Sequence, residues 1–456
     1  MYSQEESVKM CLNNSLKVIK MYEWLLDLYV LDFFIDNHWE KLPKSWRKNF
    51  SNLDPQELGK ILSGKCTHHL FPLSFLALIN TVKSLSIPRD KTSNVAIKDD
   101  SINIDTCKNH PRLKNLFLKH VKLKKRHEIS LMADVVKDVV KATHCHAVID
   151  FGSGVGHLVR MLAYRNDVHA VGIECQGPLM EEARKLDLEL EYTASKHLSK
   201  EAMEKLIRPT HFNVTLSCHK QLNQLPLPTI MKEYGLVGLH PCGDLGPLLL
   251  KHFVSYEHVK FICLVGCCYM KLSCGGENCG YPMSEFVKGM EHELSYVSRE
   301  ISCHAVEVYS ERLMKGNYED LKVISKYFTI LFYYLFCTAL ERILVECDPR
   351  LKHSPVRSVK HSSAMTFEKY CTLAVEKLNL ATLLSPEAIS RGASDLELWR
   401  RVVTVYTLRL MLAPLVETVI LYDRVLYILE QGLSCEIRPV FDPKLSPRNH
   451  IIIARR

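Results

Sequence analysis

The feature that most constrains this sequence is the run VIDFGSGVGH at residues 148–157. Its apolar start predicts a buried strand that ends in an acid, Asp150, and a sharp turn into a helix follows. The turn carries a glycine at every second position, namely Gly152, Gly154 and Gly156. Because glycine has no Cβ, backbone N–H groups in such a turn can approach a ligand closely. The run therefore predicts a cofactor pocket where the first strand ends.

The glycine spacing selects among nucleotide cofactors. A dinucleotide fingerprint needs its third glycine one position later, and this chain has His157 there. The next predicted strand ends in Glu174, 24 residues after Asp150, where an acid can accept hydrogen bonds from both hydroxyls of a ribose. The spacing therefore favours the methyl donor S-adenosylmethionine over NAD. Asp150 is expected near the methionine end of this cofactor. The alternatives are that Glu174 caps the next helix and that the glycines form only a tight turn.

Short apolar runs alternate with amphipathic ones after residue 140, which is typical of a parallel sheet with crossover helices. The expected strands are Ala147–Phe151, Ala170–Glu174, His211–Ser217, Leu236–His240 and Lys260–Gly266, with helices such as Pro178–Glu189 and Gln221–Tyr234 between them. Two more strands, Ser434–Phe441 and His450–Arg455, suggest an antiparallel hairpin at the sheet edge. Seven strands with a reversed end predict the α/β, Rossmann-like fold of class I S-adenosylmethionine-dependent methyltransferases.

At 456 residues the chain is long for one domain. We expect an N-terminal helical region with a polar linker (1–110, the linker from 88), a methyltransferase core with five strands (111–283), a helical insertion (284–430) and the last two strands (431–456). The insertion includes a basic loop at 349–361.

Composition narrows the class of protein. With 47% hydrophobic and 24% charged residues the chain is ordinary for a globular protein. A net charge of +8 from 59 basic and 51 acidic residues indicates mild affinity for polyanions, so RNA or protein is the expected partner and DNA is not. Seventeen cysteines without framework spacing favour reduced thiols in the cytoplasm or nucleus, and residues 1–30 show no signal or transit peptide.

Two apolar stretches invite a membrane interpretation. Residues 327–340 are too few to cross a bilayer. Residues 402–422 are enough, but Arg409 and Glu417 would be costly at membrane depth. Buried helices are the expected reading of both.

The acceptor side of the predicted pocket follows the fourth strand, in GLHPCGDLG at 238–246. His240, Cys242 and Asp244 offer a base, a thiol and a carboxylate, and a histidine base suits proton removal near neutral pH. The alternative is that His240 and Asp244 only satisfy backbone groups of a turn. The Asn/Asp-Pro-Pro-aromatic motif of adenine amine methylases is absent here.

The fifth strand ends in GCCY, so Cys267 and Cys268 should open toward the same cleft as Cys242. Three interpretations stay open. A thiolate such as Cys267 could attack a base, as in RNA cytosine-carbon methylases. Alternatively, four thiols could bind a zinc ion. In the third interpretation the thiols only pack as small hydrophobic groups. The zinc set would be Cys267, Cys268, Cys274 and Cys279.

A basic run, KLKKRHEIS at 122–130, precedes the core. It could hold phosphate or the donor carboxylate, with His127 and Glu128 at a helix start facing the pocket. His127 is therefore a further candidate for cofactor binding. A solvated run of charge is the alternative.

Together, KKRHEI, VIDFGSGVGHL, GLHPCGDL, VGCCYMKLS, CHAVEVYSERL and FDPKLSPRN resemble the methyltransferase-like protein 25 family over nearly the whole chain, from LPKSW onward. The resemblance implies a class I fold, S-adenosylmethionine as cofactor and methyl transfer to an unassigned acceptor. It implies that Asp150 and the three glycines form the donor turn and that 240–244 and 266–269 are pocket signatures. Pro241 stands where relatives have alanine or threonine, so the Pro-Cys match to cytosine methylases is incidental. The alternative is a catalytically silent methyltransferase-fold scaffold.

Overall fold

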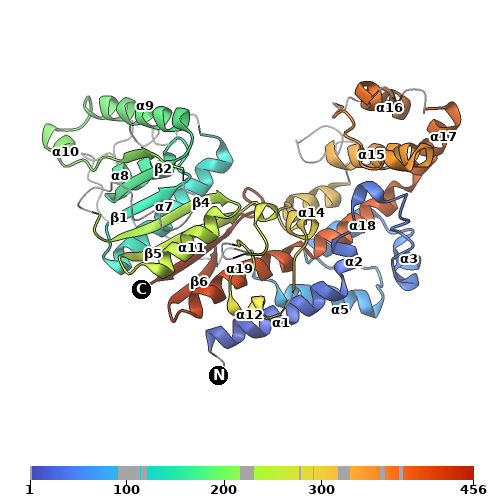
Figure 1. The fold of residues 1–456 in the computed structure, drawn as a ribbon, viewed down its shortest axis with the longest axis horizontal. Coiled ribbons are helices and arrows are strands. Elements are labelled where there is room, and N and C mark those ends of the chain that lie inside the picture. Colours follow the sequence, from blue (N-terminus) through green and yellow to red (C-terminus); the bar gives the residue numbers. More distant parts are fainter. Residues whose placement is uncertain are drawn as a thin grey trace. The chain divides into compact units, whose positions relative to one another are not determined.

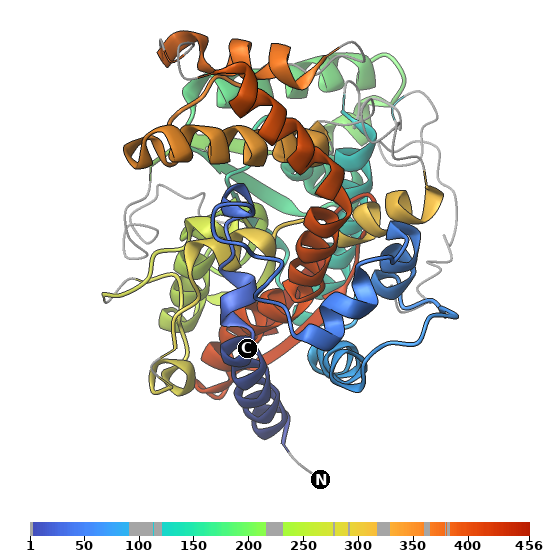
Figure 2. The ribbon, with the colours of Figure 1, turned by 90° about the vertical axis from the view of Figure 1, so that its right-hand side faces the viewer.

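The computed structural model describes residues 3–90, 113, 121–215, 231–276, 279–290, 292–316, 329–359, 365–378, 380 and 384–456. They form two compact units, which Figures 1 and 2 show from two sides. Unit 1 comprises Met1–Leu16, Ile87–Tyr296 and Glu417–Arg456, and unit 2 comprises Lys17–Ser86 and Val297–Val416. Both units combine segments that are distant in sequence. The division into four consecutive segments stays a prediction.

Unit 1 is built on a seven-stranded sheet of order β3-β2-β1-β4-β5-β7-β6. The strands are β1 (Ala147–Phe151), β2 (His169–Glu174), β3 (Thr210–Asn213), β4 (Tyr234–Cys242), β5 (Val259–Cys267), β6 (Ser434–Pro439) and β7 (His450–Arg455). The first five strands are parallel, and β7 runs antiparallel between β5 and β6. The predicted sheet with a reversed hairpin at its end is confirmed.

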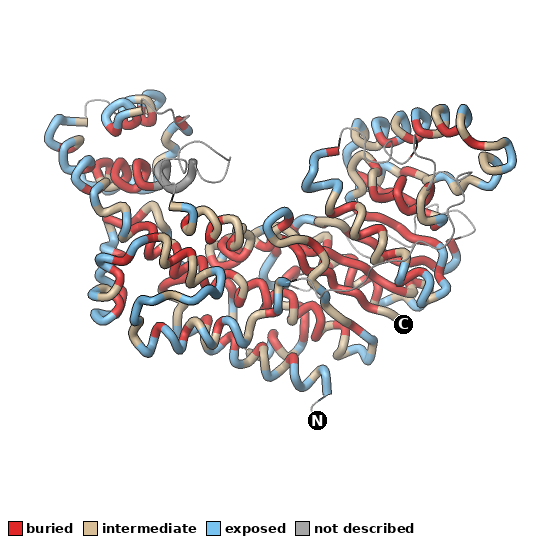
Figure 3. Tube along the Cα trace, turned by 180° about the vertical axis from the view of Figure 1, so that it is seen from behind, coloured by how far each residue is buried: buried red, intermediate tan, exposed pale blue. Residues whose placement is uncertain are grey.

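Helices cover the sheet because its central strands are apolar on both faces. All five residues of β1 are buried, and the central strands are red in Figure 3. α7 (Leu123–Thr143) buries a stripe at helical spacing that includes Ile129, Met132 and Val136, and it shares one apolar core with α8 (His157–Asn166). α11 (Leu245–Ser255) packs on β4 and β5. The remaining elements of unit 1 are α9 (Gly177–Ala194), α10 (Lys200–Glu204), η4 (Tyr269–Lys271) and α12 (Glu285–Lys288).

The strand boundaries show where sequence patterns were limited. β1 and β7 have the predicted ends, whereas β4 and β5 both extend to the cysteines that follow the predicted strands. The predicted helix Gln221–Tyr234 is wrong at its end, because Tyr234 begins β4 and pairs with Val259. Residues 221–230 of that helix lie outside the described residues, as do 91–110 of the predicted linker, 216–217 of the third strand and 360–361 of the basic loop.

Unit 2 is helical. Its elements are α2 (Glu23–Leu26), η1 (Val30–Asp32), α3 (Lys44–Phe50), α4 (Pro55–Leu62), α5 (Leu73–Leu85), α14 (Val306–Lys315), α15 (Thr329–Cys347), η6 (Pro349–Leu351), α16 (Phe367–Val375), η7 (Glu376–Leu378), α17 (Pro386–Asp395), η9 (Leu396–Leu398) and α18 (Trp399–Met411). Three helices contribute residues to both units: α1 (Gln4–Met21), α13 (Tyr296–Ile301) and α19 (Ala413–Leu429). α4 lies close to α14, since a Cβ on Gly59 would come within 2.8 Å of the Ser310 carbonyl oxygen.

Two charged residues on the apolar C-terminal helices have partners inside the protein. Within the described residues, one helical run, Pro386–Leu429, is long and apolar enough to cross a membrane, and 89% of its apolar window is buried. The Arg409 guanidinium donates to the carbonyls of Leu26 (2.8 Å) and Val297 (3.1 Å) within unit 2. In unit 1, Glu417 pairs with Arg89 at 2.6 Å and Arg448 at 3.0 Å. Such pairing makes buried charges tolerable in a core helix.

Candidate functional site

The glycine turn between β1 and α8 is fastened to β2. The N–H groups of Gly152 and Ser153 donate to the Ile173 carbonyl at 2.9 and 3.1 Å. Gly154 has φ +56°, and among the described residues no heavy atom beyond its own chain neighbours lies within 4 Å of the place where its Cβ would stand. One side of the turn is therefore open to a ligand, as the sequence predicted for a cofactor pocket.

Glu174 lies beside the turn at the carboxyl end of β2. Its Oε2 accepts a hydrogen bond from the Gly154 N–H at 2.9 Å, and its Oε1 accepts one from the Gln176 N–H at 3.0 Å. The carboxylate thus connects the turn to the start of α9. It is in the predicted place, but it already has two backbone partners.

Asp150 is completely buried near the end of β1. Burial raises the pKa of Asp150 to about 8, with Lys125 opposing the rise and Glu174 adding to it. The carboxyl group is therefore mostly protonated at pH 7. A cationic group brought beside it would favour the ionised form.

A buried ionic network lies beneath the turn, and sequence reasoning missed it. Asp187 on α9 binds the Arg160 guanidinium at 2.6 Å and His211 Nε2 at 2.7 Å. Arg160 also donates to the carbonyls of Val155 (3.3 Å) and Ala183 (3.0 Å). No local spacing in the sequence indicated these contacts, because the three partners lie on different elements, α8, α9 and β3.

Gly156 shows how tightly the turn fits this network. Its φ is +70°, and an added Cβ would lie 2.6 Å from His211 Cε1 and 3.2 Å from Ala183 Cβ. Glycine is therefore required here both for backbone conformation and for space.

His240 near the end of β4 is positioned by Glu128 on α7. Its Nε2 lies 2.9 Å from Glu128 Oε1, which also accepts a 2.5 Å hydrogen bond from the Ser446 hydroxyl. Burial opposes ionisation of Glu128, but these partners outweigh it and hold its pKa below the usual range. His240 Nδ1 is buried and has no hydrogen-bond partner among the described residues. The predicted base thus has one occupied and one unoccupied ring nitrogen.

The other two polar candidates hold loops. His127 Nε2 accepts a hydrogen bond from the Asp442 backbone N–H at 2.9 Å, so it contacts the segment between β6 and β7. Asp244 Oδ1 accepts one from the Ser273 N–H at 2.9 Å. Both side chains therefore have structural partners in loops.

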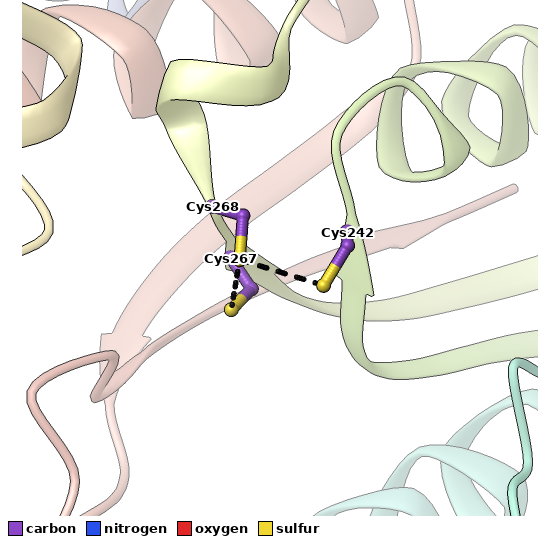
Figure 4. Close-up of side chains that lie close together, drawn as sticks. All are labelled: Cys242, Cys267 and Cys268. Atoms are coloured by element: carbon purple, nitrogen blue, oxygen red, sulfur yellow. Dashed lines mark hydrogen bonds between the residues drawn. The ribbon is translucent and has the colours of Figure 1, made fainter. Parts of the chain in front are cut away.

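Three thiols meet where β4 and β5 end, as Figure 4 shows. Cys242 and Cys267 are register partners in the parallel pair, and a left-handed backbone at Cys268 (φ +49°) follows. Cys268 Sγ lies 3.5 Å from Cys242 Sγ and 3.4 Å from Cys267 Sγ. Cys242 is exposed and the other two are partly buried. Cys274 and Cys279, the other members of the predicted zinc set, are not part of this thiol group.

The thiols differ in acidity. Hydrogen bonding with Cys267 lowers the pKa of Cys242 to about 5, although burial opposes this. The same hydrogen bond, together with burial, raises the pKa of Cys267, and burial raises that of Cys268. Cys242 is therefore the most acidic thiol of the group.

Arg424 on α19 is a second feature that no sequence pattern indicated. It is buried, and its Nε and Nη1 atoms have no hydrogen-bond partner in the part of the chain that the structure describes. Its guanidinium lies 5.6 Å from the ring centroid of Tyr269, whose hydroxyl donates to Glu417 at 3.1 Å. The segment after β5 is thus anchored to α19.

Comparison with known proteins fits this geometry. Residues 124–275 match a family model described as a methyltransferase domain, and they contain the glycine turn, Glu174, His240 and the three thiols. The chain contains a methyltransferase domain. This match and the strand order confirm the predicted fold class. S-adenosylmethionine is the cofactor of that class.

Two relatives carry the name probable methyltransferase-like protein 25. The mouse (Mus musculus) protein is 31% identical over 233 residues, which are 48% of this chain and 37% of the relative. The human (Homo sapiens) protein is 32% identical over 239 residues, which are 48% of this chain and 36% of the relative. The aligned region thus spans little more than a third of the length of these relatives. The predicted resemblance to these proteins thus extends over about half of this chain.

A solved structure is also similar. The plantazolicin methyltransferase BpumL, determined in complex with SAH, is 11% identical, with 61% of this chain and 87% of that chain covered and a TM-score of 0.22. Similarity this low adds nothing to the assignment, which rests on the family match and the strand order.

Proposed function

We propose that this chain is an S-adenosylmethionine-dependent methyltransferase that acts on protein or RNA. The observation that carries the proposal is the constellation at the ends of β1 and β2: an open glycine turn, a buried acid before it and a second acid beside it. All of these residues lie inside the matched methyltransferase domain.

The residues present fit the cofactor. The open side of Gly154 leaves room for it against the backbone, and the Glu174 carboxylate can exchange its bonds to N–H groups for bonds to ribose hydroxyls. Asp150, neutral in the free protein, would ionise beside the ammonium group of the methionine moiety. The cofactor supplies an electrophilic methyl group, and the chain binds it and orients the acceptor.

His240 is the base that we propose for an acceptor that must lose a proton. Its Nε2 is bound to Glu128, so its unpartnered Nδ1 is the atom available for proton transfer. Lys122, Lys124 and Lys125 are exposed at the start of α7, which supports contact with a polyanion. Within the family we propose that the chain is nearest to members described as ribosomal RNA adenine dimethylase domain-containing, although the adenine motif is absent.

Calorimetry with S-adenosylmethionine tests the cofactor. We expect binding by the full chain and at least tenfold weaker binding by Glu174→Ala, because the ribose loses its acceptor. Glu182→Ala is a matched control, since Glu182 is exposed on α9. No binding to the unchanged chain at millimolar ligand would refute the proposal.

Transfer of a labelled methyl group tests the activity. Protein and RNA fractions from cells that lack this chain are incubated with labelled donor and purified chain, with Asp150→Asn as control. Label in one fraction identifies the acceptor class.

A silent scaffold is the second candidate, and one observation favours it. Both Glu174 oxygens already accept backbone hydrogen bonds, so the site is internally satisfied without a cofactor. The scaffold predicts that partner binding and cellular function survive Glu174→Ala. Loss of function in that variant with partner binding intact would exclude it.

A further inference from the structure

Three cysteine side chains converge at the acceptor end of the sheet, and the proposed function leaves them without a role. Cys242 and Cys267 end two neighbouring strands, Cys268 follows the second, and all three Sγ atoms lie within 4.8 Å of one another. One thiol is exposed, so the group is open to solvent. Thiols that only fill space in a core do not need this mutual approach.

The sulfur separations match those of a metal site. Four ligands at about 2.3 Å from a tetrahedral zinc ion place neighbouring sulfurs roughly 3.8 Å apart. The two measured separations are 3.5 and 3.4 Å. A disulfide would require about 2.05 Å.

We propose that Cys242, Cys267 and Cys268 bind one zinc ion and leave its fourth position open for a thiol that accepts the methyl group. The thiol part rests on the proposed function, whereas the zinc part does not. The ligand set differs from the one predicted from sequence, because it takes Cys242 from β4 in place of Cys274 and Cys279.

The open position follows from the donor set. Among the described residues, no fourth histidine, cysteine, aspartate or glutamate belongs to this cluster. Structural zinc sites are closed by four protein ligands, whereas sites with three leave one position for water or substrate. Soft thiolates also favour zinc over magnesium or calcium, which prefer oxygen ligands.

The place of the cluster suits an acceptor. Ligands of open α/β sheets bind outside the carboxyl ends of the strands, where β4 and β5 end and where the glycine turn follows β1. All these residues belong to unit 1. An acceptor bound at the thiols would therefore lie at the carboxyl ends of the parallel strands, as the donor pocket does.

The reaction balances with these components. Binding to zinc releases the thiol proton to solvent and leaves a thiolate at neutral pH. The thiolate electron pair forms a bond to the methyl carbon while the bond from that carbon to the sulfonium sulfur of the donor breaks. The electron pair of the broken bond stays on the donor sulfur, so the products are a thioether and S-adenosylhomocysteine.

Metal analysis of the full chain tests the zinc site. We expect one zinc per chain, and a sulfur-to-cobalt charge-transfer band after replacement by Co²⁺. Cys242→Ser should weaken zinc binding at least tenfold and keep the fold, because Cys242 is exposed. Cys274→Ser, an exposed cysteine outside the cluster, should retain both zinc and the cobalt band. The site would be overturned if the two variants bound zinc with equal affinity. Absence of zinc from the unchanged chain, or from both variants, would also overturn it.

Methyl transfer to defined acceptors tests the thiol. The probes are 2-mercaptoethanol, a cysteine-containing peptide, the same peptide with serine, and an RNA oligonucleotide. Label on either thiol, reduced at least tenfold by Cys242→Ser, supports the inference and separates a small thiol from a protein cysteine. Label on RNA that is unchanged in Cys242→Ser overturns it.

Calorimetry separates this failure from failure of the proposed function. Cys242→Ser should bind S-adenosylmethionine as the unchanged chain does, because Cys242 is not in the donor pocket. If the unchanged chain binds zinc through the three thiols but no S-adenosylmethionine, the proposed function and the thiol acceptor are both refuted and the zinc site stands.

Discussion

The donor edge and the acceptor edge of the sheet are held in different ways. At the donor edge, where β1 and β2 end, Glu174 is bound by two N–H groups and the turn lies on the buried Arg160–Asp187–His211 network. At the acceptor edge, where β4 and β5 end, the thiols contact one another and Cys242 is exposed. The first is fixed by the protein's own bonds, and the second keeps groups available for a ligand.

The difference teaches which part of such a site must be formed in advance. A donor pocket made of backbone and carboxylates depends on the turn having one conformation, so its surroundings are rigidly bonded. An acceptor edge supplies nucleophiles, bases or metal ligands. These groups must have lone pairs that are not already engaged by other protein groups. If this view is right, substitutions at the donor edge will cost folding stability and those at the acceptor edge will not.

The largest expected effect is that of Asp187→Ala. It leaves the Arg160 guanidinium buried without its carboxylate, so we expect the free energy of unfolding to fall by about 3–5 kcal/mol. Denaturant titration measures the change. Glu182→Ala, exposed on the same helix, should change stability by less than about 0.5 kcal/mol. A similar small change for Asp187→Ala would mean that the network does not support the turn.

Gly156→Ala should have the next largest effect. The variant combines a left-handed alanine with a contact of 2.6 Å to His211, and together these should cost about 2–4 kcal/mol. Gly154→Ala has only the backbone cost, about 1 kcal/mol, because nothing surrounds its Cβ. Thermal unfolding of both variants shows the difference. Equal costs would contradict the close fit between turn and network.

Asp150 should make stability depend on pH. Its pKa is raised in the folded protein to about 8, so the native state binds a proton that the unfolded state releases above about pH 4. Stability should therefore fall as pH rises, by about 2 kcal/mol between pH 6 and 8. Asp150→Asn should lack this decline when unfolding is measured at both pH values. The same slope in the variant would show that another group is responsible.

Cys242→Ser should have the smallest effect. In metal-free protein we expect a change of less than about 0.5 kcal/mol, because the side chain is exposed. Denaturant titration in the presence of a chelator gives the value. A loss near that of Gly156→Ala would remove the contrast between the two edges.

The sequence predicted where the donor-edge residues lie in the fold, for a physical reason. A glycine turn, an acid before it and an acid one strand later are local patterns with fixed spacing, so Asp150, Gly154 and Glu174 could be placed from periodicity alone. The fold followed from the alternation of strands and helices, with two further strands predicted after the helical insertion.

The acceptor edge was harder to predict from the sequence, because its contacts join residues that are distant along the chain. Nothing local indicates that Glu128 would meet His240 across 112 positions. The strand ends did predict that Cys267 and Cys268 lie near Cys242, but the zinc set expected from the sequence took Cys274 and Cys279 instead of Cys242. The register of β4 against β5 determines the thiol group, and the end of β4 was predicted two residues too early. Arg424 and Ser446 were missed because their partners lie on other elements.

The position of β7 has a consequence for synthesis of the chain. β7 pairs with β5, yet His450 is translated about 180 residues after Cys267. At 5–20 residues per second the edge of β5 waits roughly 10–40 s for its partner, while the segment Val297–Val416 is being made. The nascent chain therefore carries an unpaired apolar strand edge throughout this interval, which is a stage at which chaperones and aggregation compete for it.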